Sequence, residues 1–443
     1  MQPSLDDIRS ALNAYHAPDL FVIRVSGQEL DLETCFVNLA IVEAPEHRQM
    51  EKQDLKAQAA IFHRIPSSEK VQNTDTQSLI ALEQLFNKRK RGGKEAEPKR
   101  ILVQGRAGIG KTTLCKKLVH AHQNGLRRDL FDTVLWLPLR QLRGLKSRTL
   151  EGLFREKVFI AQDFDQEQAA LARALAACAQ KGRVLFILDR LDEIVTDTGG
   201  EESRNFRSFL KTLLEQQHVV ITSRHSGLDS ELLPPIDLEL ETVGFSQLNV
   251  KDFVIKVLEP EAARTVQDFI HRTPLIRGLV NIPVQLDVIC FSWDSLPKDG
   301  AAITMTGLYQ LMVRKLWCKD ARRLKRTAGG MDLTERQIGQ LAPMDIDDLM
   351  AIELQHLGYL AFKGMANNHQ IEFDERDLLC AFGDLKDRAA EKSRLLPPQL
   401  VEVMKQTSFL HTADADLHHE NGSSRQAWHF LHLTFQEYSR QRG

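Results

Sequence analysis

The sequence has no excess charge of either sign and few cysteines. Its 443 residues carry 58 basic and 60 acidic side chains, a balance that argues against nucleic acid as the main partner. The 6 cysteines lie far apart and form no Cys-x-x-Cys pair, so neither a disulfide framework nor a zinc site is expected. They are typical of reduced core residues in an intracellular protein.

A long uncharged hydrophobic run is also missing. Residues 1–10 include acidic side chains and no apolar stretch of the length found in signal peptides. No later run approaches the length needed to cross a bilayer. We therefore expect a cytoplasmic protein with no membrane partner, and the chain length suits about three domains.

The most informative stretch is a glycine-rich loop, Gly105-Arg106-Ala107-Gly108-Ile109-Gly110-Lys111-Thr112-Thr113, which we predict binds nucleotide. It follows an apolar run at 101–103 and opens a stretch of helical periodicity, so strand, loop and helix are expected in turn. Gly105 and Gly110 lack Cβ and allow backbone N–H groups to approach phosphate oxygens. Lys111 would supply charge to the terminal phosphates, and Thr112 a hydroxyl ligand for Mg²⁺.

A second motif is the continuous apolar run 184–189, which ends in an acid. Such a run suits a strand buried on both faces of a parallel sheet, where ligands bind beyond the carboxyl end. Asp189 is the expected partner of Thr112 at a Mg²⁺ ion. Asp192 and Glu193, on the turn beyond, could orient or deprotonate an attacking water, and we take them as catalytic candidates. An acidic turn that only ends the strand is the alternative.

The third motif is the apolar strand predicted at 218–224, which ends in Arg224. An arginine at this edge could contact the terminal phosphate and sense its presence, and it is the third catalytic candidate. It could equally cap a helix or pair with Asp192. Strands alternating with helices across 100–245 predict an α/β fold with a doubly wound parallel sheet.

We divide the sequence into five parts. A small α/β segment of unknown role at 1–86 is followed by a charged linker at 87–99. The basic run 88–94 would also suit a nuclear signal or a nucleic-acid patch, but the acids that follow favour a solvated linker. The nucleotide-binding domain at 100–245 precedes a helical domain at 246–298 and a winged-helix domain at 299–443. No recognition helix rich in Arg, Lys, Asn and Gln is visible, so packing fits the winged helix better than DNA binding.

Histidines gather near the end of the sequence: His411, His418, His419, His429 and His432. Their spacing and the lack of acidic or thiol companions argue against a metal cluster. His432 ends a predicted strand beside Phe430 and Phe435. Taken alone, it is typical of a core histidine.

Together and in this order, the motifs resemble the NACHT family of signal-transduction ATPases, especially its fungal members. The residues that carry the resemblance are 100–114, 185–193, 220–224 and 430–438, and it extends over about 100–441. It implies ATP or ADP with Mg²⁺ as cofactor, bound between the sheet domain and a winged helix. Lys111 and Thr112 would hold phosphate and Mg²⁺, with Asp189, Asp192 and Glu193 serving the metal and water.

The resemblance also implies roles for three further residues. Arg224 would sense the γ-phosphate, and Pro283 in Asn281-Ile282-Pro283 would pack on the base. His432 would reach the β-phosphate of ADP and lock a closed state. The implied function is a nucleotide-dependent switch that controls self-association in innate-immune or incompatibility signalling, with slow ATP hydrolysis at most.

Two departures from the family matter. Arg190 stands where members carry glycine or another small residue; it could crowd the Mg²⁺ site or pair with Asp192, which puts hydrolysis in doubt more than binding. No ankyrin, leucine-rich, tetratricopeptide or WD repeat is found after the winged helix. Two other functions stay open: a P-loop ATPase enzyme with turnover as its output, and a nucleotide-dead interaction module.

Overall fold

The computed structural model describes residues 3–26, 28–35, 40–43, 80–91, 94–105, 108–142, 145–159, 166–194, 201–224, 231–296, 305–328, 331–366, 372–374, 376–380, 397–412 and 427–430. Contacts divide the chain into two compact units, Met1–Asp287 and Val288–Gly443. Each unit is described by itself. No described helix has the length and apolar character to cross a membrane.

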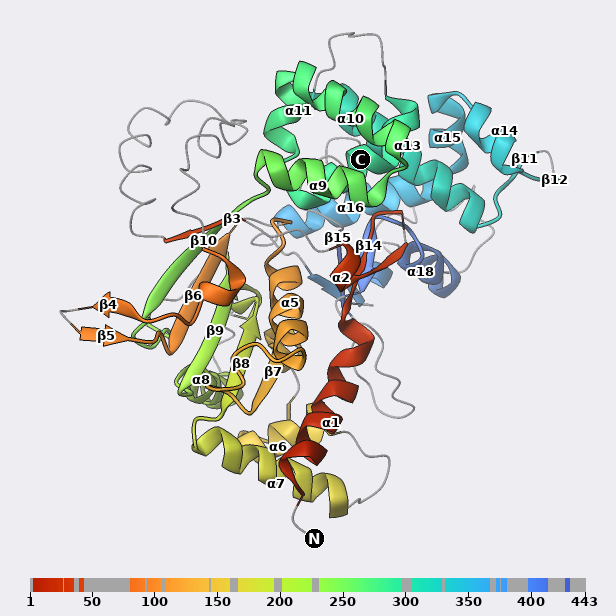
Figure 1. Cartoon of the computed structure of the whole chain (residues 1–443). Helices are drawn as coiled ribbons and strands as arrows, with labels where there is room; N and C mark the ends of the chain where they lie inside the picture. The colour runs from red at the N-terminus through yellow and green to blue at the C-terminus, as the bar shows by residue number, and fades with distance from the viewer. Residues whose placement is uncertain are drawn as a thin grey trace. The chain divides into compact units, whose positions relative to one another are not determined.

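A six-stranded sheet with strand order β3-β10-β6-β9-β8-β7 is the centre of the first unit (Figure 1). Its strands are β3 (Ala40–Glu43), β6 (Arg100–Gly105), β7 (Thr133–Pro138), β8 (Val184–Asp189), β9 (His218–Ser223) and β10 (Leu238–Gly244). β10, β6, β9, β8 and β7 pair in parallel, and only β3 pairs antiparallel, along β10. The mostly parallel α/β sheet predicted from the sequence is confirmed.

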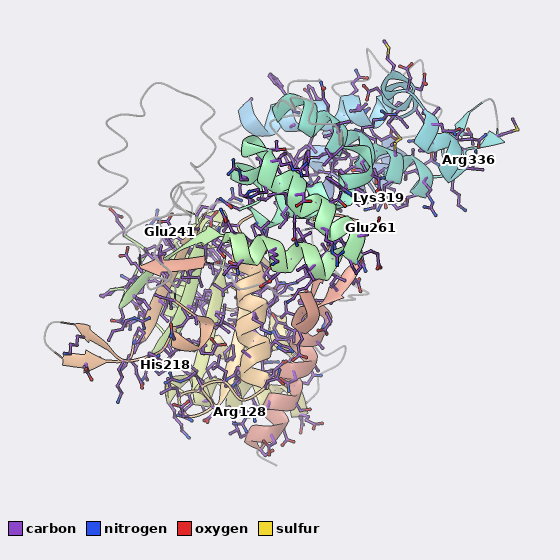
Figure 2. The ribbon with its side chains drawn as sticks, turned by 45° about the horizontal axis from the view of Figure 1, so that its top comes forward. Arg128, His218, Glu241, Glu261, Lys319 and Arg336 are labelled. Carbon is purple, nitrogen blue, oxygen red and sulfur yellow. The ribbon has the colours of Figure 1, made fainter. Side chains whose placement is uncertain are left out.

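The central strands are apolar throughout because both faces of the sheet are covered. Every residue of β7 and of β8 is buried, as expected for parallel strands between two helical layers. β10 differs, since it alternates buried residues with partly exposed ones such as Glu241 (Figure 2). The helices α5 (Lys111–Gln123), α6 (Leu150–Leu153), α7 (Gln166–Gln180) and α8 (Glu201–Leu214) complete this part of the fold.

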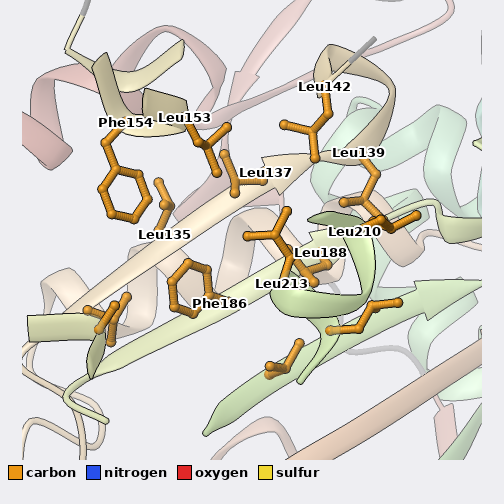
Figure 3. Close-up of a cluster of buried hydrophobic side chains, with 14 of the residues drawn as sticks. Leu135, Leu137, Leu139, Leu142, Leu153, Phe154, Phe186, Leu188, Leu210 and Leu213 are labelled. Atoms are coloured by element: carbon orange, nitrogen blue, oxygen red, sulfur yellow. The ribbon is translucent and has the colours of Figure 1, made fainter. Parts of the chain in front are cut away.

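One hydrophobic cluster lines one face of the sheet. Leu135 and Leu137 of β7 and Phe186 and Leu188 of β8 point into it together, because alternate strand residues face the same side (Figure 3). Leu153 and Phe154 come from α6 and its continuation, and the Phe154 and Phe186 rings stack with centroids 6.5 Å apart. Leu210 and Leu213 of α8 close the cluster.

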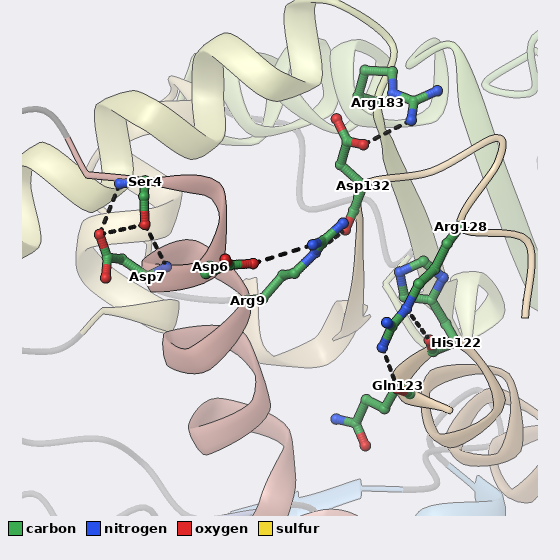
Figure 4. A network of polar contacts seen from close by, with 9 residues as sticks. All are labelled: Ser4, Asp6, Asp7, Arg9, His122, Gln123, Arg128, Asp132 and Arg183. Carbon is green, nitrogen blue, oxygen red and sulfur yellow. Dashed lines mark hydrogen bonds and ion pairs between the residues drawn. The ribbon is translucent and has the colours of Figure 1, made fainter. Parts of the chain in front are cut away.

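The N-terminal segment is part of the same unit as the sheet. α1 (Leu5–His16) begins at a capping box, in which Asp7 N donates to Ser4 Oγ at 3.2 Å and Ser4 N donates to Asp7 Oδ2 at 2.7 Å (Figure 4). The helix packs along β7, and Arg9 Nε donates to Asp132 O at 3.0 Å. The hairpin β1 (Phe21–Ile23) and β2 (Glu29–Asp31) and the short helix α2 (Leu32–Cys35) follow. Because β3 then joins the sheet, part of the predicted 1–86 segment extends the sheet of the domain predicted at 100–245.

The basic run at 88–94 contributes to a hairpin of β4 (Arg89–Arg91) and β5 (Lys94–Ala96), within the segment where the sequence predicts a solvated linker. Lys90 stands opposite Glu95, and opposite charges across a strand pair favour pairing. The Arg89 guanidinium donates to the carbonyls of Gln84, Leu85 and Asn87, at the end of the turn η3 (Leu82–Gln84). Arg89, one of the basic residues of this run, therefore stabilises the local backbone.

Four helices follow the sheet: α9 (Gln247–Val257), α10 (Pro260–Arg272), α11 (Pro274–Leu279) and α12 (Pro283–Ser292). Ser246 caps α9, and prolines occupy the first positions of α10, α11 and α12, where their missing N–H groups cost nothing. The sequence predicts helices near 250–258, 261–270 and 283–291, and α9, α10 and α12 lie there. The structure adds α11, which the sequence did not indicate.

The second unit is mostly helical, with α13 (Met305–Arg323), α14 (Glu335–Gln340), α15 (Pro343–Leu349), α16 (Ala351–Ala366) and α18 (Pro397–Lys405). It also has the strand pair β11 (Thr327–Ala328) and β12 (Met331–Asp332), and a three-stranded antiparallel sheet, β13 (Glu372–Asp374), β15 (Ala427–Phe430) and β14 (Leu410–Thr412). The sequence predicts one amphipathic helix over 345–363, but the structure has two, since α15 ends at Leu349 with Met350 as its C-cap and α16 begins at Ala351. The sequence also predicts a final helix at 434–440; it lies outside the described residues, so the winged helix stays a prediction.

Burial of His16 at the end of α1 predicts a loss of stability in acid. Removal from water lowers its pKa from 6.5 to about 4. Between these values the unfolded state takes up a proton that the folded state excludes, so stability falls with falling pH from about 6.5 to 4, and above 6.5 there is no effect. We expect a loss of roughly 2 kcal/mol at pH 5 relative to pH 7.5, measured by urea unfolding. His16→Gln should lack this component; equal pH slopes would contradict the prediction.

Candidate functional site

The glycine-rich loop lies between the carboxyl end of β6 and the start of α5. Gly108 and Gly110 have left-handed backbone angles, with φ of 70° and 102°, which glycine adopts without strain. Gly110 is the N-cap of α5, and no side chain caps the helix. The first N–H groups of a helix lack partners within it and favour an anion, so this end is suited to phosphate. Arg106 and Ala107 lie outside the described residues.

Gly105 is required for close packing rather than for its backbone angle. A Cβ at this position would lie 1.9 Å from Thr242 Oγ1 and 3.0 Å from Ile109 Cγ2. The Thr242 hydroxyl donates to Gln104 O at 3.1 Å, which fixes it against the end of β6. The glycine expected here for close approach to phosphate is therefore also required for packing against Thr242 and Ile109.

Lys111 is buried at the start of α5, with only 8% of its surface exposed. Its Nζ donates to Gly105 O at 2.6 Å. Removal from water lowers the pKa of Lys111 to about 8, against the opposing effects of Asp192 and Asp189, and the cations Arg224 and Arg190 lower it further. A phosphate entering the loop would stabilise the charged ammonium in this poorly hydrated position.

Asp189 and Thr112 come together as predicted, although they are far apart in the sequence. Asp189 is 1% exposed at the end of β8, and Thr112 Oγ1 donates to its Oδ2 at 2.9 Å. Thr222, on the neighbouring strand β9, donates to Asp189 Oδ1. The buried Cys115 thiol is also hydrogen-bonded to Asp189; burial is the main cause of its raised pKa. The carboxylate at the end of β8 is therefore held by three side chains from two elements, α5 and β9.

Arg190 lies beside the two expected Mg²⁺ ligands. Its Nε is 3.2 Å from Thr112 Oγ1 and 3.9 Å from Asp189 Oδ2. The backbone of Arg190 is left-handed, with φ of 65°, and its N–H donates to Thr222 Oγ1 at 2.9 Å. Of the two positions considered for this side chain, the structure thus shows the one that crowds the metal ligands.

Arg224 pairs with Asp192, one of the alternatives that the sequence left open. Arg224 Nε lies 3.1 Å from Asp192 Oδ2, and Arg224 N donates to Asp192 Oδ1 at 2.9 Å. The carboxylate is 6% exposed and ties the turn after β8 to the end of β9. The neighbouring Glu193 ends the turn Leu191–Glu193, and its side chain lies outside the described part.

A close backbone contact joins the end of β10 to Asn281, just before α12, beside the loop residue Ile109. Gly244 has φ of 99°, and a Cβ there would lie 2.2 Å from Asn281 O and 2.8 Å from Ile109 Cδ1. Phe245 N donates to the same Asn281 oxygen at 2.8 Å. Two residues later, Pro283 begins α12 and is partly buried. His432, the predicted contact to ADP, lies outside the described residues.

Sequence reasoning missed three residues that shape this site: Thr222, Thr242 and Gly244. Each stands at or near the carboxyl end of a buried strand. A hydroxyl in such an apolar setting needs a hydrogen-bond partner, which was the available signal for the two threonines. The role of Gly244 depends on a carbonyl 37 positions away, which no local pattern reveals.

The donor set suits Mg²⁺ in kind, since a hydroxyl and a carboxylate are the hard oxygen ligands that this ion prefers. In the structure, however, Thr112 and Asp189 bond to each other and a guanidinium adds positive charge beside them. The arrangement fits nucleotide phosphates, whereas Mg²⁺ would have to displace Arg190.

The parallel sheet, the glycine-rich loop between strand and helix, and the buried lysine and carboxylate at its edge define a P-loop NTPase-like α/β fold. Residues 99–261 match the model of the NACHT domain, and residues 261–304 match a domain of unknown function, DUF7068. Residues 99–261 are therefore a NACHT domain, which confirms the resemblance seen in the motifs.

Relatives include NACHT, LRR and PYD domains-containing proteins of two rodents. The 1a allele 5 protein of Rattus norvegicus is 26% identical over 231 residues, covering 48% of this chain and 18% of the relative. The 1b allele 4 protein of Mus musculus is 25% identical over 231 residues, covering 48% and 24%. This chain thus spans only a minor part of these relatives' length.

Similar solved structures include a Signal Transduction ATPase with Numerous Domains (STAND) protein with a tetratricopeptide repeat sensor, from Pyrococcus horikoshii. It is 11% identical, with a TM-score of 0.30, and the match covers 77% of this chain and 40% of that one. The ORC2 protein of Aeropyrum pernix is 12% identical, with a TM-score of 0.31, over 77% and 88% of the two chains.

Proposed function

We propose that this chain is the nucleotide-dependent switch of a signalling protein, binding ADP or ATP at the loop 105–113. The observation that carries the proposal is the buried Lys111, placed beside Asp189 and Asp192 at the uncapped start of α5. Loop N–H groups and the ammonium would bind the phosphates. Pro283 would pack on the base, and Thr112 and Asp189 are the oxygens that would meet a Mg²⁺ ion.

Switching requires two arrangements that differ in nucleotide affinity, because a ligand shifts an equilibrium only by that difference. The Arg224 pair with Asp192 supplies one difference: a γ-phosphate competes with Asp192 for the guanidinium, and a diphosphate does not. Gly244 lies against both Ile109 of the loop and the Asn281 carbonyl just before α12, which offers a route from the loop to α12. Release of α12 would then favour self-association in the cytoplasm, and the His432 contact with ADP stays part of this proposal.

Lys111→Ala is expected to lower ADP affinity by about 10- to 150-fold, since a charge-assisted hydrogen bond contributes about 1.5–3 kcal/mol. The measurements are titration with a fluorescent ADP analogue and mass spectrometry of nucleotide that copurifies. Lys117→Ala is the control, a lysine on the same helix beyond the loop. His432→Ala should loosen ADP and increase oligomers in light scattering. Unchanged ADP content in both variants would rule the proposal out.

Two measurements, phosphate release and nucleotide binding, distinguish the proposed switch from the two alternatives, an ATPase enzyme and a nucleotide-dead module. Steady-state phosphate release far above slow, switch-like rates would favour an ATPase whose output is hydrolysis. Protein that purifies without nucleotide and does not bind added ADP would favour the dead module. The site supports the switch over rapid turnover, because Asp192, a candidate for activating water, is held by Arg224.

A further inference from the structure

Arg190 occupies a backbone position that suits glycine. Left-handed φ is rare for residues with a Cβ, and only Arg127, Arg190 and Lys325 show it among the described non-glycine residues. The hydrogen bond from Arg190 N to Thr222 Oγ1 fixes the peptide, and Thr222 also holds Asp189. This left-handed conformation places Arg190 beside Thr112 and Asp189, the expected metal ligands. It costs conformational free energy that a glycine would not lose.

The side chain brings a positive charge to this place. Arg190 is 27% exposed and Asp189 is 1% exposed, so their attraction is only partly screened by water. Lys111, Arg190 and Arg224 surround the loop, against Asp189 and Asp192. Among these five described side chains, three cations face two anions, so together they carry a net positive charge without a metal.

We propose that the Arg190 guanidinium replaces Mg²⁺ as the counter-charge beside Thr112 and Asp189, so that this chain binds a nucleoside diphosphate without a divalent ion. This inference deepens the proposed nucleotide switch and rests on it. A guanidinium attached to the chain is always present, which removes the metal requirement for holding ADP. Mg²⁺ and Arg190 compete for the same two oxygens, so the metal gains access only when the side chain moves.

The test compares ADP affinity in Mg²⁺ and in EDTA for three proteins: wild type, Arg190→Gly and Arg127→Gly. Arg127 is the matched control, because it shares the left-handed backbone, with φ of 55° against 65°, but lies in the turn after α5. Wild type and Arg127→Gly should change by less than about threefold when Mg²⁺ is removed, and Arg190→Gly should lose at least about tenfold. Arg190→Lys, with its charge kept, should follow wild type more closely than the glycine variant.

A second readout is independent of affinity and of hydrolysis. Mn²⁺ is the probe, and its binding in the presence of ADP is measured by electron paramagnetic resonance. We expect Mn²⁺ to bind Arg190→Gly and to bind wild type much more weakly. Equal metal dependence and equal Mn²⁺ binding in wild type and Arg190→Gly would overturn the inference while leaving nucleotide binding intact. Absence of ADP binding by every variant in either buffer would overturn the proposed switch as well. Thermal melting of the glycine variants checks that they fold.

Discussion

Arg24→Ala is expected to lower the free energy of unfolding of the 1–287 unit by about 3–5 kcal/mol, because it leaves a buried carboxylate without its cation. Arg24 and Asp287 are 8% and 9% exposed, and Arg24 Nε donates to Asp287 Oδ1 at 2.7 Å. Val25 N donates to the other carboxylate oxygen at 2.8 Å. The measurement is urea unfolding of the full chain.

Two further variants separate burial from charge alone. Lys211→Ala removes an exposed pair with Glu215, whose side chains are 56% and 50% exposed, and should cost less than about 0.5 kcal/mol. The double variant Arg24→Ala/Asp287→Asn should recover part of the loss, because the amide is neutral and its oxygen can still accept from Val25 N. A loss of unfolding free energy below about 1 kcal/mol for Arg24→Ala would show that the Arg24–Asp287 pair contributes no more than an exposed ion pair.

Gly244→Ala is the second large effect we expect, with a loss of at least about 3 kcal/mol in stability together with weakened ADP binding. The new methyl group would face Asn281 O at 2.2 Å in a backbone that is already left-handed. That carbonyl cannot move easily, since it accepts from Phe245 N. Any relaxation would displace Ile109, whose Cδ1 is 2.8 Å from the same point, and with it the phosphate loop.

Gly125→Ala is the matched control for this prediction. Gly125 has φ of 106°, close to the 99° of Gly244, but a Cβ there would meet nothing within 4 Å. It should lose only the conformational cost, about 1–2 kcal/mol, and keep ADP affinity. The difference between the two variants measures the contact with Asn281. Equal losses would show that backbone strain alone explains both.

The sequence predicted the parts of this fold that local patterns determine. The apolar runs at 101–103, 184–189 and 218–224 became β6, β8 and β9, since a strand covered on both faces must be apolar throughout. The meeting of Thr112 with Asp189 followed from the rule that parallel strands present their carboxyl ends at one edge. The use of these residues toward nucleotide stays a prediction.

The remainder depends on partners distant in the sequence. β3 joins the sheet through β10, some 200 positions later, and Asp287 is 263 positions from Arg24. No periodicity reveals such pairs. Arg224 shows the same limit, because an arginine at a strand end suits a phosphate or a carboxylate equally, and the position of Asp192 in space decides between them.

Residues 21–25 are bound both to α5 and to α12. Lys116 Nζ donates to Phe21 O at 3.1 Å, and three residues after Phe21 the Arg24 guanidinium holds Asp287. If α12 moves away from the sheet, either the β1–β2 hairpin must move with it or the ion pair between Arg24 and Asp287 must break. A ligand or protein that binds residues 21–31 would therefore change how readily α12 moves, although its binding surface is remote from the phosphate loop.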